Sequence, residues 1–548
     1  MQTPRFLRLI FAIGAGVSLF AGAAEAAPAA KDDPERKVLF GMRGLPPKPR
    51  PDPLMPMIDE FGQYMHKDWP GKIHSPEDFK TRREEEAADL DSHPGPPNWD
   101  PYGGWKDGPP LEATGFFRAQ KHEGKWWLVD PEGRLFFSHG IDCVRWGNET
   151  PLDGRETWFA ALPDEKSEFA QFYMKWAKPI YKDDYKGQTP RGYNFSAANL
   201  RRKYGEDWKK TTAQMAHKRL RSWGLNTIGN WSGEEIYLLR KTPYVVAISY
   251  ETPNIEGSQG MWKKFPDVFD PRFRAALRKR MVAERGKSAG DPWLLGYFVD
   301  NELGWGKDTS LALSALVSPA EQAAKKAFVD DLKAQYEAID ALNTVWGTPY
   351  ESWDALLAST QAPNEQKARE DLLAFNARIA EQYFQTCREA VKEVAPNNLY
   401  LGCRFAGSNE IAARAAVKYC DVVSKNLYKR PGEAAQFQLY QGADCPLIVG
   451  EFHFGALDRG MFHTGLVGVE SQEARAAAYK AYVEGMLRHA QFVGCHWFQH
   501  GDQPTTGRFD GENYQIGFLD GCDTPYGETI AASREMGAQL YEIRSKAP

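Results

Sequence analysis

Two glutamates follow apolar runs in a pattern that suits acid–base and nucleophilic chemistry. Glu302 ends the run "LLGYFVDNE", and Glu451 follows the apolar part of "PLIVGEFHFG". Two carboxyl groups that face each other across a cleft can cleave a glycosidic bond, because one protonates the leaving oxygen while the other attacks the sugar carbon. The proton donor needs a raised pKa, and the nucleophile must stay ionised. A structural salt bridge is the alternative for a single glutamate, but the pair, with Asn301 before Glu302, favours catalysis.

Neighbours of Glu302 raise further expectations. Asp300 shares a strand face with Glu302 one layer deeper, where a charge needs a partner, so we expect it to orient a neighbouring polar side chain. Gly304 and Gly306 are expected to let the chain turn sharply into a long insertion. Trp305, between them, could stack on a sugar or anchor that insertion.

Eight short apolar runs, which could position these groups, alternate with stretches of helical periodicity. Such continuous runs are typical of strands buried on both faces. The pattern predicts a (β/α)8 TIM barrel; an open doubly wound sheet is the alternative, but the chain has no G-x-G-x-x-G or Walker loop for a nucleotide-binding version. The runs are "LFFSHGID", "LNTIGNW", "YVVAISYE", "LLGYFVDNE", "YLGCRF", "VVSKNLY", "PLIVGEFHFG" and "VGCHWFQHGDQP", and helices are expected at 207–222, 271–285, 366–394, 408–419 and 471–491.

Polar or aromatic residues follow the predicted strands, at the end of the barrel where catalytic residues are found. Beside the two glutamates, the candidate substrate-binding residues are Asn301, Asn230, Trp231, Arg404, Asn426, Tyr428, His453, Trp497, Gln499 and Trp305. Packing within the barrel is the alternative role for each of them. Tyr428 could also donate to Glu451 and hold its charge, and His453 could point into the cleft because residues two apart share a strand face.

The chain divides into three parts by composition. Residues 1–26 have the basic start, apolar run and small-x-small site of a secretory signal peptide, with an uncleaved anchor as the alternative. Residues 27–112 are Pro-rich and charged, which indicates an extended surface arm. Residues 113–548 form the predicted catalytic domain, with long insertions at 145–205 and 306–365 on the catalytic face. We therefore expect a secreted or periplasmic protein.

The bulk composition excludes some partners. The net charge of −5 argues against polyanions such as nucleic acid, and no later run is long enough to cross a membrane. Seven cysteines without a CxxC, and histidines without an H-E-x-x-H spacing, give no reason to expect a metal or other cofactor. The 17 tryptophans suit either flat platforms for sugars or a large core. Oligomeric state is left open.

The glutamate pattern resembles the clan of retaining glycosidases built on (β/α)8 barrels. That resemblance implies that Glu302 is the acid/base, Glu451 the nucleophile, and Asn301 a ligand of the reacting sugar's 2-hydroxyl. It also implies that Trp497 floors the sugar subsite. Several stretches between about residues 115 and 540 resemble the β-agarases of glycoside hydrolase family 50, namely "KWWLVDPEGRLFFSHGID", "ETWFAALP", "GYFVDNELGWG", "IVGEFHFGALDRG" and "GENYQIGFLDGCDTPYGE".

These resemblances imply a secreted retaining hydrolase that cleaves β-galactosidic linkages in agarose-type galactan or its oligosaccharides. "LNTVWGTPYESW" resembles β-galactosidases of a neighbouring barrel family, so an exo-acting β-galactosidase is the runner-up. A non-catalytic glycan-binding barrel and a metal-dependent hydrolase are two rival interpretations of the same residues. The short arm favours soluble oligosaccharides over solid polymer, because a sizeable carbohydrate-binding domain often precedes this type of barrel.

Overall fold

The computed structural model describes residues 54–175 and 189–547 and contains the predicted parallel sheet of eight strands. Neighbouring strands of the sheet follow one another along the chain, except that the first, β4, pairs with the last, β14; this order is that of a barrel and not of a doubly wound sheet. The predicted signal peptide lies outside the described residues. The strands are β4 (Ser138–Ile141), β8 (Thr227–Ile228), β9 (Tyr244–Ile248), β10 (Leu294–Val299), β11 (Leu399–Tyr400), β12 (Val423–Asn426), β13 (Leu447–Phe452) and β14 (Phe492–Trp497).

The two ends of this sheet meet. Phe405, just after β11, forms a parallel bridge with Lys425 of β12, and the backbone N–H of Asn426 donates to the Phe405 carbonyl. The sheet therefore closes into the expected barrel. Its interior is filled by apolar side chains from alternate strand positions, as is usual for barrels of this kind; they include Val245, Leu295, Phe298, Leu401, Ile448 and Val493.

A small antiparallel sheet closes the amino-terminal end of the barrel. It consists of β1 (Arg118–His122), β2 (Lys125–Val129) and β3 (Leu135–Phe136), and Leu128 and Phe136 join the interior cluster. The first predicted strand run is thus divided, because its first two residues pair with β2 and only the later ones enter the barrel.

Helices surround the barrel, and short polar signals fix where several of them begin. Asp270 caps α6 by accepting from the backbone N–H of Arg272, and Pro271 occupies the first turn. Asn409 and Ser471 cap the helices that follow β11 and β13 in the same way. The outer helices are α3 (Phe195–Tyr204), α4 (Trp208–Ser222), α5 (Glu234–Tyr237), α6 (Pro271–Val282), α11 (Arg369–Val394), α12 (Glu410–Tyr419), α13 (Pro431–Ala434), α14 (Gln472–Arg488) and α15 (Gly527–Lys546).

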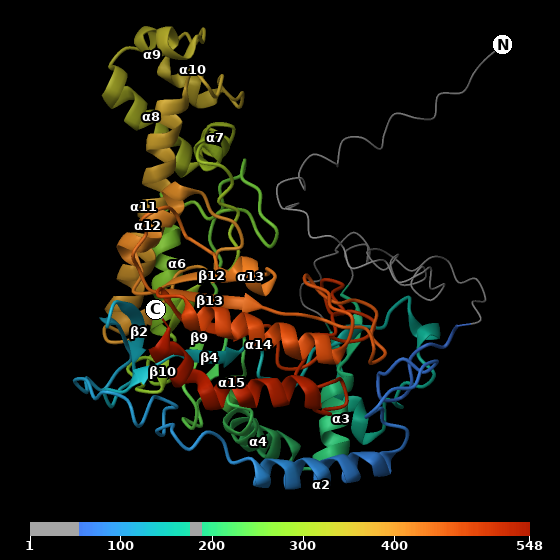
Figure 1. The fold of residues 1–548 in the computed structure, drawn as a ribbon. Helices are drawn as coiled ribbons and strands as arrows, with labels where there is room; N and C mark the ends of the chain where they lie inside the picture. The colour runs from blue at the N-terminus through green and yellow to red at the C-terminus, as the bar shows by residue number, and fades with distance from the viewer. Residues whose placement is uncertain (1–53, 176–188, 548) are drawn as a thin grey trace, which may run out of the picture.

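Both predicted insertions follow strand ends on the carboxyl side. The one after β10 forms a helical group that rises from the barrel beside the upper half of α11 (Figure 1). The one after β4 carries a three-stranded antiparallel sheet and two 3-10 turns. These elements are α7 (Ser310–Leu316), α8 (Ala323–Tyr336), α9 (Ile339–Trp346), α10 (Trp353–Ala358), β5 (Thr150–Pro151), β6 (Tyr173–Lys175), β7 (Arg191–Tyr193), η1 (Glu156–Trp158) and η2 (Glu168–Phe172).

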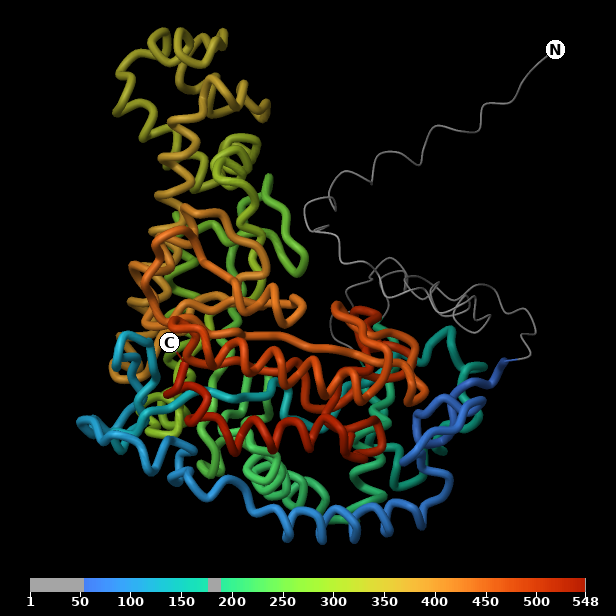
Figure 2. The backbone as a smooth tube through the Cα atoms, viewed as in Figure 1, coloured from blue at the N-terminus to red at the C-terminus, as the bar shows by residue number. Residues whose placement is uncertain are grey.

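The described part of the arm, residues 54–112, runs along one side of the barrel beneath α3 and α4 (Figure 2). It contains a helix, α2 (Pro76–Ser92), that its Pro-rich composition did not indicate. The signal was present, because Ser75 and Asp78 form a capping box and Pro76 stands at the first helical position. The arm is therefore extended only in part.

Candidate active site

The two glutamates lie at the carboxyl ends of β10 and β13, and their side chains meet at one amide. The Asn426 amide nitrogen donates to Oε1 of Glu302 at 2.9 Å and to Oε1 of Glu451 at 2.8 Å. These two oxygens can be no farther apart than the sum of those distances. That sum is shorter than the roughly 6.5–9.5 Å that separates the carboxyl groups of inverting glycosidases.

Arg404 binds Glu451 and two further polar side chains. Its Nη2 donates to Glu451 Oε1 at 2.7 Å and to Asp142 Oδ2 at 2.9 Å, and its Nε donates to Asn301 Oδ1 at 2.9 Å. The Arg404 and Asp142 side chains have no exposed surface. The buried Arg404 thus links three side chains: Glu451, Asn301 and Asp142. The sequence placed Asp142 only at the end of a predicted strand.

The backbone at this rim is held in a conformation that is uncommon for residues with a side chain. Asp300, Glu302 and Arg404 have φ angles of 64°, 53° and 53°. Left-handed backbone outside glycine costs energy and is found most often at functional sites, where the surrounding contacts maintain it. Here it turns the chain immediately after β10 and β11 so that Glu302 and Arg404 both reach the cleft.

Burial and neighbouring negative charges raise the pKa values of two acids of the site. The pKa of Glu302 is raised above its ordinary value, first by burial and then by the neighbouring Glu451 carboxylate. Burial also raises the pKa of Asp142 to about 7, although Arg404 opposes the shift. Burial alone would lower the pKa of Arg404, but Asp142 and Glu451 outweigh it and raise the value. A raised pKa at Glu302, next to a second carboxyl group that is held by Arg404, suits the proton donor of acid–nucleophile chemistry.

Tyr428 completes the contacts of Glu451. Its hydroxyl donates a short hydrogen bond to Glu451 Oε2, so the carboxylate receives three donors in all. His453 packs against the Tyr428 ring at 4.6 Å. Both nitrogens of this histidine bind backbone, since Nδ1 faces the Phe498 carbonyl and Nε2 accepts from the Leu466 N–H. The expectation that His453 binds a sugar hydroxyl is therefore wrong; it supports Tyr428 from behind.

Solved structures resemble this chain over most of its length. The structure described as an exo-β-agarase is 34% identical, with a TM-score of 0.83 over 91% of this chain and 74% of that one. The agarase AgWH50C is also 34% identical, with a TM-score of 0.84 over 91% and 75% of the two chains. PfGH50B gives 31% identity and a TM-score of 0.81.

The chain belongs to glycoside hydrolase family 50. Among named relatives of this family-50 chain, β-agarase B of Vibrio sp. strain JT0107 is 36% identical over 531 residues, which is 89% of this chain and 55% of that protein. β-Agarase A of the same strain is 34% identical over 535 residues, with 88% and 52% covered. The chain thus spans about half the length of these Vibrio relatives. A family model described as β-galactosidase (glycoside hydrolase family 42) matches residues 258–445.

Two tryptophans proposed as sugar platforms are buried in the cluster that packs the family-50 barrel against its helices. Trp305 is 1% exposed and stacks on Phe384 at 5.3 Å, beneath the insertion that it anchors. Trp497 has no exposed surface, and its Nε1 donates to the Ile516 carbonyl. The expectation that they stack on substrate is wrong, because aromatic side chains of α11, α14 and the neighbouring strand and loops bury both rings.

Three other candidates remain near the Arg404–Glu451 group. The Trp231 ring lies 4.6 Å from the Arg404 guanidinium and is half-buried. Both side-chain polar atoms of Asn230 are buried without a partner, as is Oε1 of Gln499. Buried polar atoms are seldom left unpaired in native proteins, and such groups commonly bind water or a ligand. These residues, together with Asn301 and Asn426, fit the role of hydroxyl ligands.

Sequence reasoning missed two functional candidates in loops. Trp262, in "GMWKKFP", donates from its indole N–H to Glu302 Oε2 at 2.9 Å. Glu512, in the motif "GENYQIGF", lies near Glu451 and binds Arg508 at 2.7 Å, and burial raises its pKa to about 7. No strand pattern marks either residue. A methionine and a tryptophan between a glycine and two lysines, in a segment outside any predicted strand or helix, are the signal that could have found Trp262.

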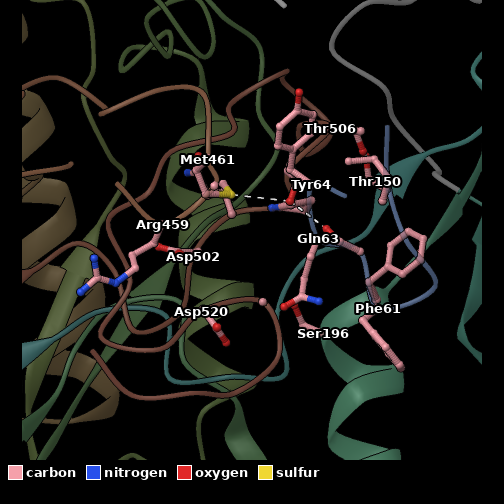
Figure 3. A pocket seen from close by; sticks show the side chains of 18 of the residues that line it. Phe61, Gln63, Tyr64, Thr150, Ser196, Arg459, Met461, Asp502, Thr506 and Asp520 are labelled. Atoms are coloured by element: carbon pink, nitrogen blue, oxygen red, sulfur yellow. Dashed lines mark hydrogen bonds between the residues drawn. The ribbon is translucent and has the colours of Figure 1, made fainter. Parts of the chain in front are cut away.

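A separate pocket lies between the arm and the loops after β13 and β14 (Figure 3). Several of its polar side chains have partners within the protein: Asp502 accepts from Tyr526, Gln63 donates to the Ile73 carbonyl, and Arg459 donates to Glu528. The pocket is therefore a joint between the arm and the barrel. Two further features are absent from the part of the chain that the structure describes. Among the described residues, no three His, Cys, Asp or Glu side chains form a metal-binding group. No helix within residues 54–175 or 189–547 is both long and apolar enough to span a bilayer.

Proposed function

We propose that this family-50 chain is a retaining glycoside hydrolase that cleaves β-galactosidic linkages in agarose-type galactan or its oligosaccharides. One observation carries the proposal: Asn426 binds an oxygen of both glutamates at once, which favours the short separation of carboxyl groups that retaining chemistry uses. The substrate class rests on the family, whose relatives include β-agarases and a structure described as an exo-β-agarase.

The reaction proceeds in two steps that share one proton. Glu302 gives its proton to the leaving oxygen while a Glu451 oxygen attacks the anomeric carbon, so the glycosidic bond breaks and an ester to the enzyme forms. Glu302, now ionised, takes a proton from water, and the resulting hydroxide oxygen displaces Glu451. The sugar leaves with its original anomeric configuration, and both glutamates return to their starting charge.

The contacts of each glutamate suit its role. The pKa of Glu302 is raised by burial and by Glu451, so this acid keeps its proton to higher pH than an ordinary glutamate, as a proton donor requires. Glu451 receives hydrogen bonds from Arg404, Asn426 and Tyr428, which orient its carboxylate toward the sugar. Asn301, fixed by Arg404, is placed to bind a hydroxyl of the reacting sugar.

Stereochemistry and products test the proposal together. Proton NMR of the first-formed product on neoagaro-oligosaccharides should show the β-anomer before mutarotation; a first-formed α-anomer would refute retention. Chromatography of the products separates substrate classes. Release of oligosaccharides from agarose-type chains supports the agarase assignment, and galactose as the sole product supports the runner-up, an exo-β-galactosidase, which the match at residues 258–445 favours. Binding without cleavage at any pH would indicate a glycan-binding barrel.

Export remains a prediction from the sequence. The apolar run at residues 9–24 and the small-x-small site before Ala27 support a signal peptide. A secreted enzyme would meet a galactan substrate outside the cell. Amino-terminal sequencing of the protein recovered from the culture medium should begin near Ala27.

A further inference from the structure

The loop between β9 and α6 brings an exposed aromatic side chain against Glu302. Trp262 donates to Glu302 Oε2 at 2.9 Å, while Asn426 occupies Oε1. The Trp262 side chain is 40% exposed, and its neighbour Met261 is 81% exposed. Most large apolar side chains in the described residues are buried, so this pair leaves an open apolar surface at the edge of the cleft.

An ion pair between a buried carboxylate and a partly exposed lysine fixes the loop to the end of the strand before Glu302. Lys263, next to Trp262, donates to Asp300 Oδ1 at 2.5 Å. The Asp300 side chain is 1% exposed, and its other oxygen accepts from the hydroxyls of Tyr250 at 2.6 Å and Tyr383 at 2.9 Å. Asp300 therefore does orient polar neighbours, and through Lys263 it determines where the loop lies.

Close backbone approach fixes the loop on the other side of Glu302. A Cβ on Gly304 would lie 2.2 Å from the Gln259 carbonyl oxygen, so only glycine permits this contact. Ser258 then closes the loop, because its hydroxyl donates to the Ile255 carbonyl and accepts from the Phe265 N–H. Gly304 thus serves contact with the loop and not the sharp turn expected from the sequence; the positive φ of 59° is at Gly306.

We propose that Trp262 binds the sugar unit on the leaving side of the cleaved bond and also positions Glu302, with Asp300, Lys263 and Gly304 holding its loop in place. The inference rests on the proposed function, in which Glu302 gives its proton to the leaving oxygen. The leaving unit must therefore lie beside Glu302, within reach of the exposed indole. Tryptophan suits this place because its ring offers a flat apolar face and its N–H a polar handle.

Glu302 is also surrounded by groups that do not depend on Trp262. Glu451 faces it from β13, Arg404 from the end of β11, and Lys425 and Tyr428 from β12 and the loop after it. Burial and Glu451 raise the pKa of Glu302, whereas the Trp262 and Asn426 hydrogen bonds lower it. Removing only the indole N–H should therefore raise the pKa further, with every other neighbour unchanged.

Two substitutions separate the two roles of Trp262. Trp262→Phe keeps a ring but removes the donor, so the basic limb of the kcat/KM profile should move to higher pH. Trp262→Ala also removes the ring, so KM for neoagaro-oligosaccharides should rise about three- to tenfold, the usual worth of one aromatic contact. KM for a glycosyl fluoride, whose leaving group is too small to reach the ring, should stay the same. Lys263→Met and Gly304→Ala should reproduce the KM effect with Trp262 present.

A matched control lies far from the cleft. Trp126 also donates from its indole to a carboxylate, Asp444, at 2.7 Å, so Trp126→Phe removes the same kind of bond and should leave the pH profile unchanged. An unshifted basic limb in Trp262→Phe, or equal KM changes on both substrates in Trp262→Ala, would overturn the inference while wild-type turnover upholds the proposed function. Absence of wild-type turnover on both substrates would instead overturn the proposed function, and the inference with it.

Discussion

Two buried clusters of charged residues in this molecule differ in how their charges are paired. The arm cluster joins α2 to the barrel and contains Glu86, Lys203, Arg219 and Asp523. The catalytic cluster lies at the strand ends and contains Asp142, Glu302, Arg404 and Glu451. Both are largely removed from water, where an unpaired charge is costly, yet only one of them is balanced.

Every charged group of the arm cluster has a partner of opposite charge within the cluster. Its two cations face its two anions, with Arg219 at 2.6 Å from both Glu86 and Asp523, and Lys203 at 3.0 Å and 2.8 Å from the same pair. The two cations stabilise both carboxylates as ions, since Lys203 and Arg219 lower the pKa of Glu86 and Asp523 against the effect of burial. Such a cluster holds the arm in place and has nothing left to bind.

The catalytic cluster is left incomplete. Arg404 is the cation that contacts its carboxylates, and three carboxyl groups gather round it. Nη1 of Arg404 and Oδ1 of Asn426 are buried without a partner. The contrast indicates how a binding site differs from a structural cluster of buried charges. In a site, some charges and hydrogen-bonding atoms have no partner within the cluster, so they can bind substrate.

The same substitution in the two clusters should break different properties. Glu451→Gln removes the nucleophile, and loss of a covalent nucleophile costs up to about 10⁶-fold in turnover. Stability should not fall, because one of several crowded carboxylates is neutralised. Steady-state assays and thermal unfolding of the same preparation check both points. A variant with wild-type kcat would contradict the nucleophile assignment.

Glu86→Gln should do the reverse. It leaves Lys203 and Arg219 with one carboxylate between them, and a broken buried pair costs about 3–5 kcal/mol of unfolding free energy. Activity per folded molecule should be unchanged. Urea unfolding measures the loss, with Glu484→Gln as the control, since its pair with Arg488 is exposed and should matter by less than about 1 kcal/mol. Equal losses of unfolding free energy in both variants would show that the buried arm cluster stabilises the fold no more than an exposed ion pair does.

Tyr428→Phe should have an intermediate effect confined to catalysis. The substitution removes one of three donors to Glu451 and leaves the ring packed on His453. Removing a single donor that stabilises charge in an active site costs about a hundredfold in kcat. The melting temperature should hardly change. A loss in KM alone, with kcat preserved, would mean that Tyr428 binds substrate and does not serve the nucleophile.

The smallest expected effect is a displacement of the pH profile. The raised pKa of Glu302 means that the acid keeps its proton to higher pH than an ordinary glutamate, whose value is about 4.3. The basic limb of kcat/KM, which reports this acid in the free enzyme, should therefore lie above that value. Glu302→Gln assayed on a glycosyl fluoride should lack the limb. A limb at the ordinary glutamate value would contradict the raised pKa.

The sequence was sufficient to predict the barrel and to expect Glu302 and Glu451 at its strand ends, where their side chains meet at Asn426, because both depend on local patterns. Continuous apolar runs predict strands buried on both faces, and polar residues after such runs must emerge at one end of a barrel. Asn426 and Arg404 were found for the same reason. The family resemblance, carried by motifs such as "GYFVDNELGWG", is confirmed by the structural relatives.

What failed depended on long-range packing. Trp305 and Trp497 stand at the predicted places, but whether a ring faces solvent depends on loops distant in sequence, such as the one around Phe518 that covers Trp497. His453 was misread because its partners are backbone groups, which sequence letters do not show. Trp262 was missed because the approach of its loop to Gly304 is set by tertiary contact.

Covalent labelling tests the central claim most directly. An activated 2-deoxy-2-fluoro-galactosyl substrate should form the glycosyl-enzyme and then hydrolyse slowly, so that the ester accumulates. Peptide mass spectrometry should then find one sugar on the peptide that contains Glu451, and none after Glu451→Gln. A sugar on any other residue, or turnover without a covalent species, would contradict the assignment of Glu451 as the nucleophile.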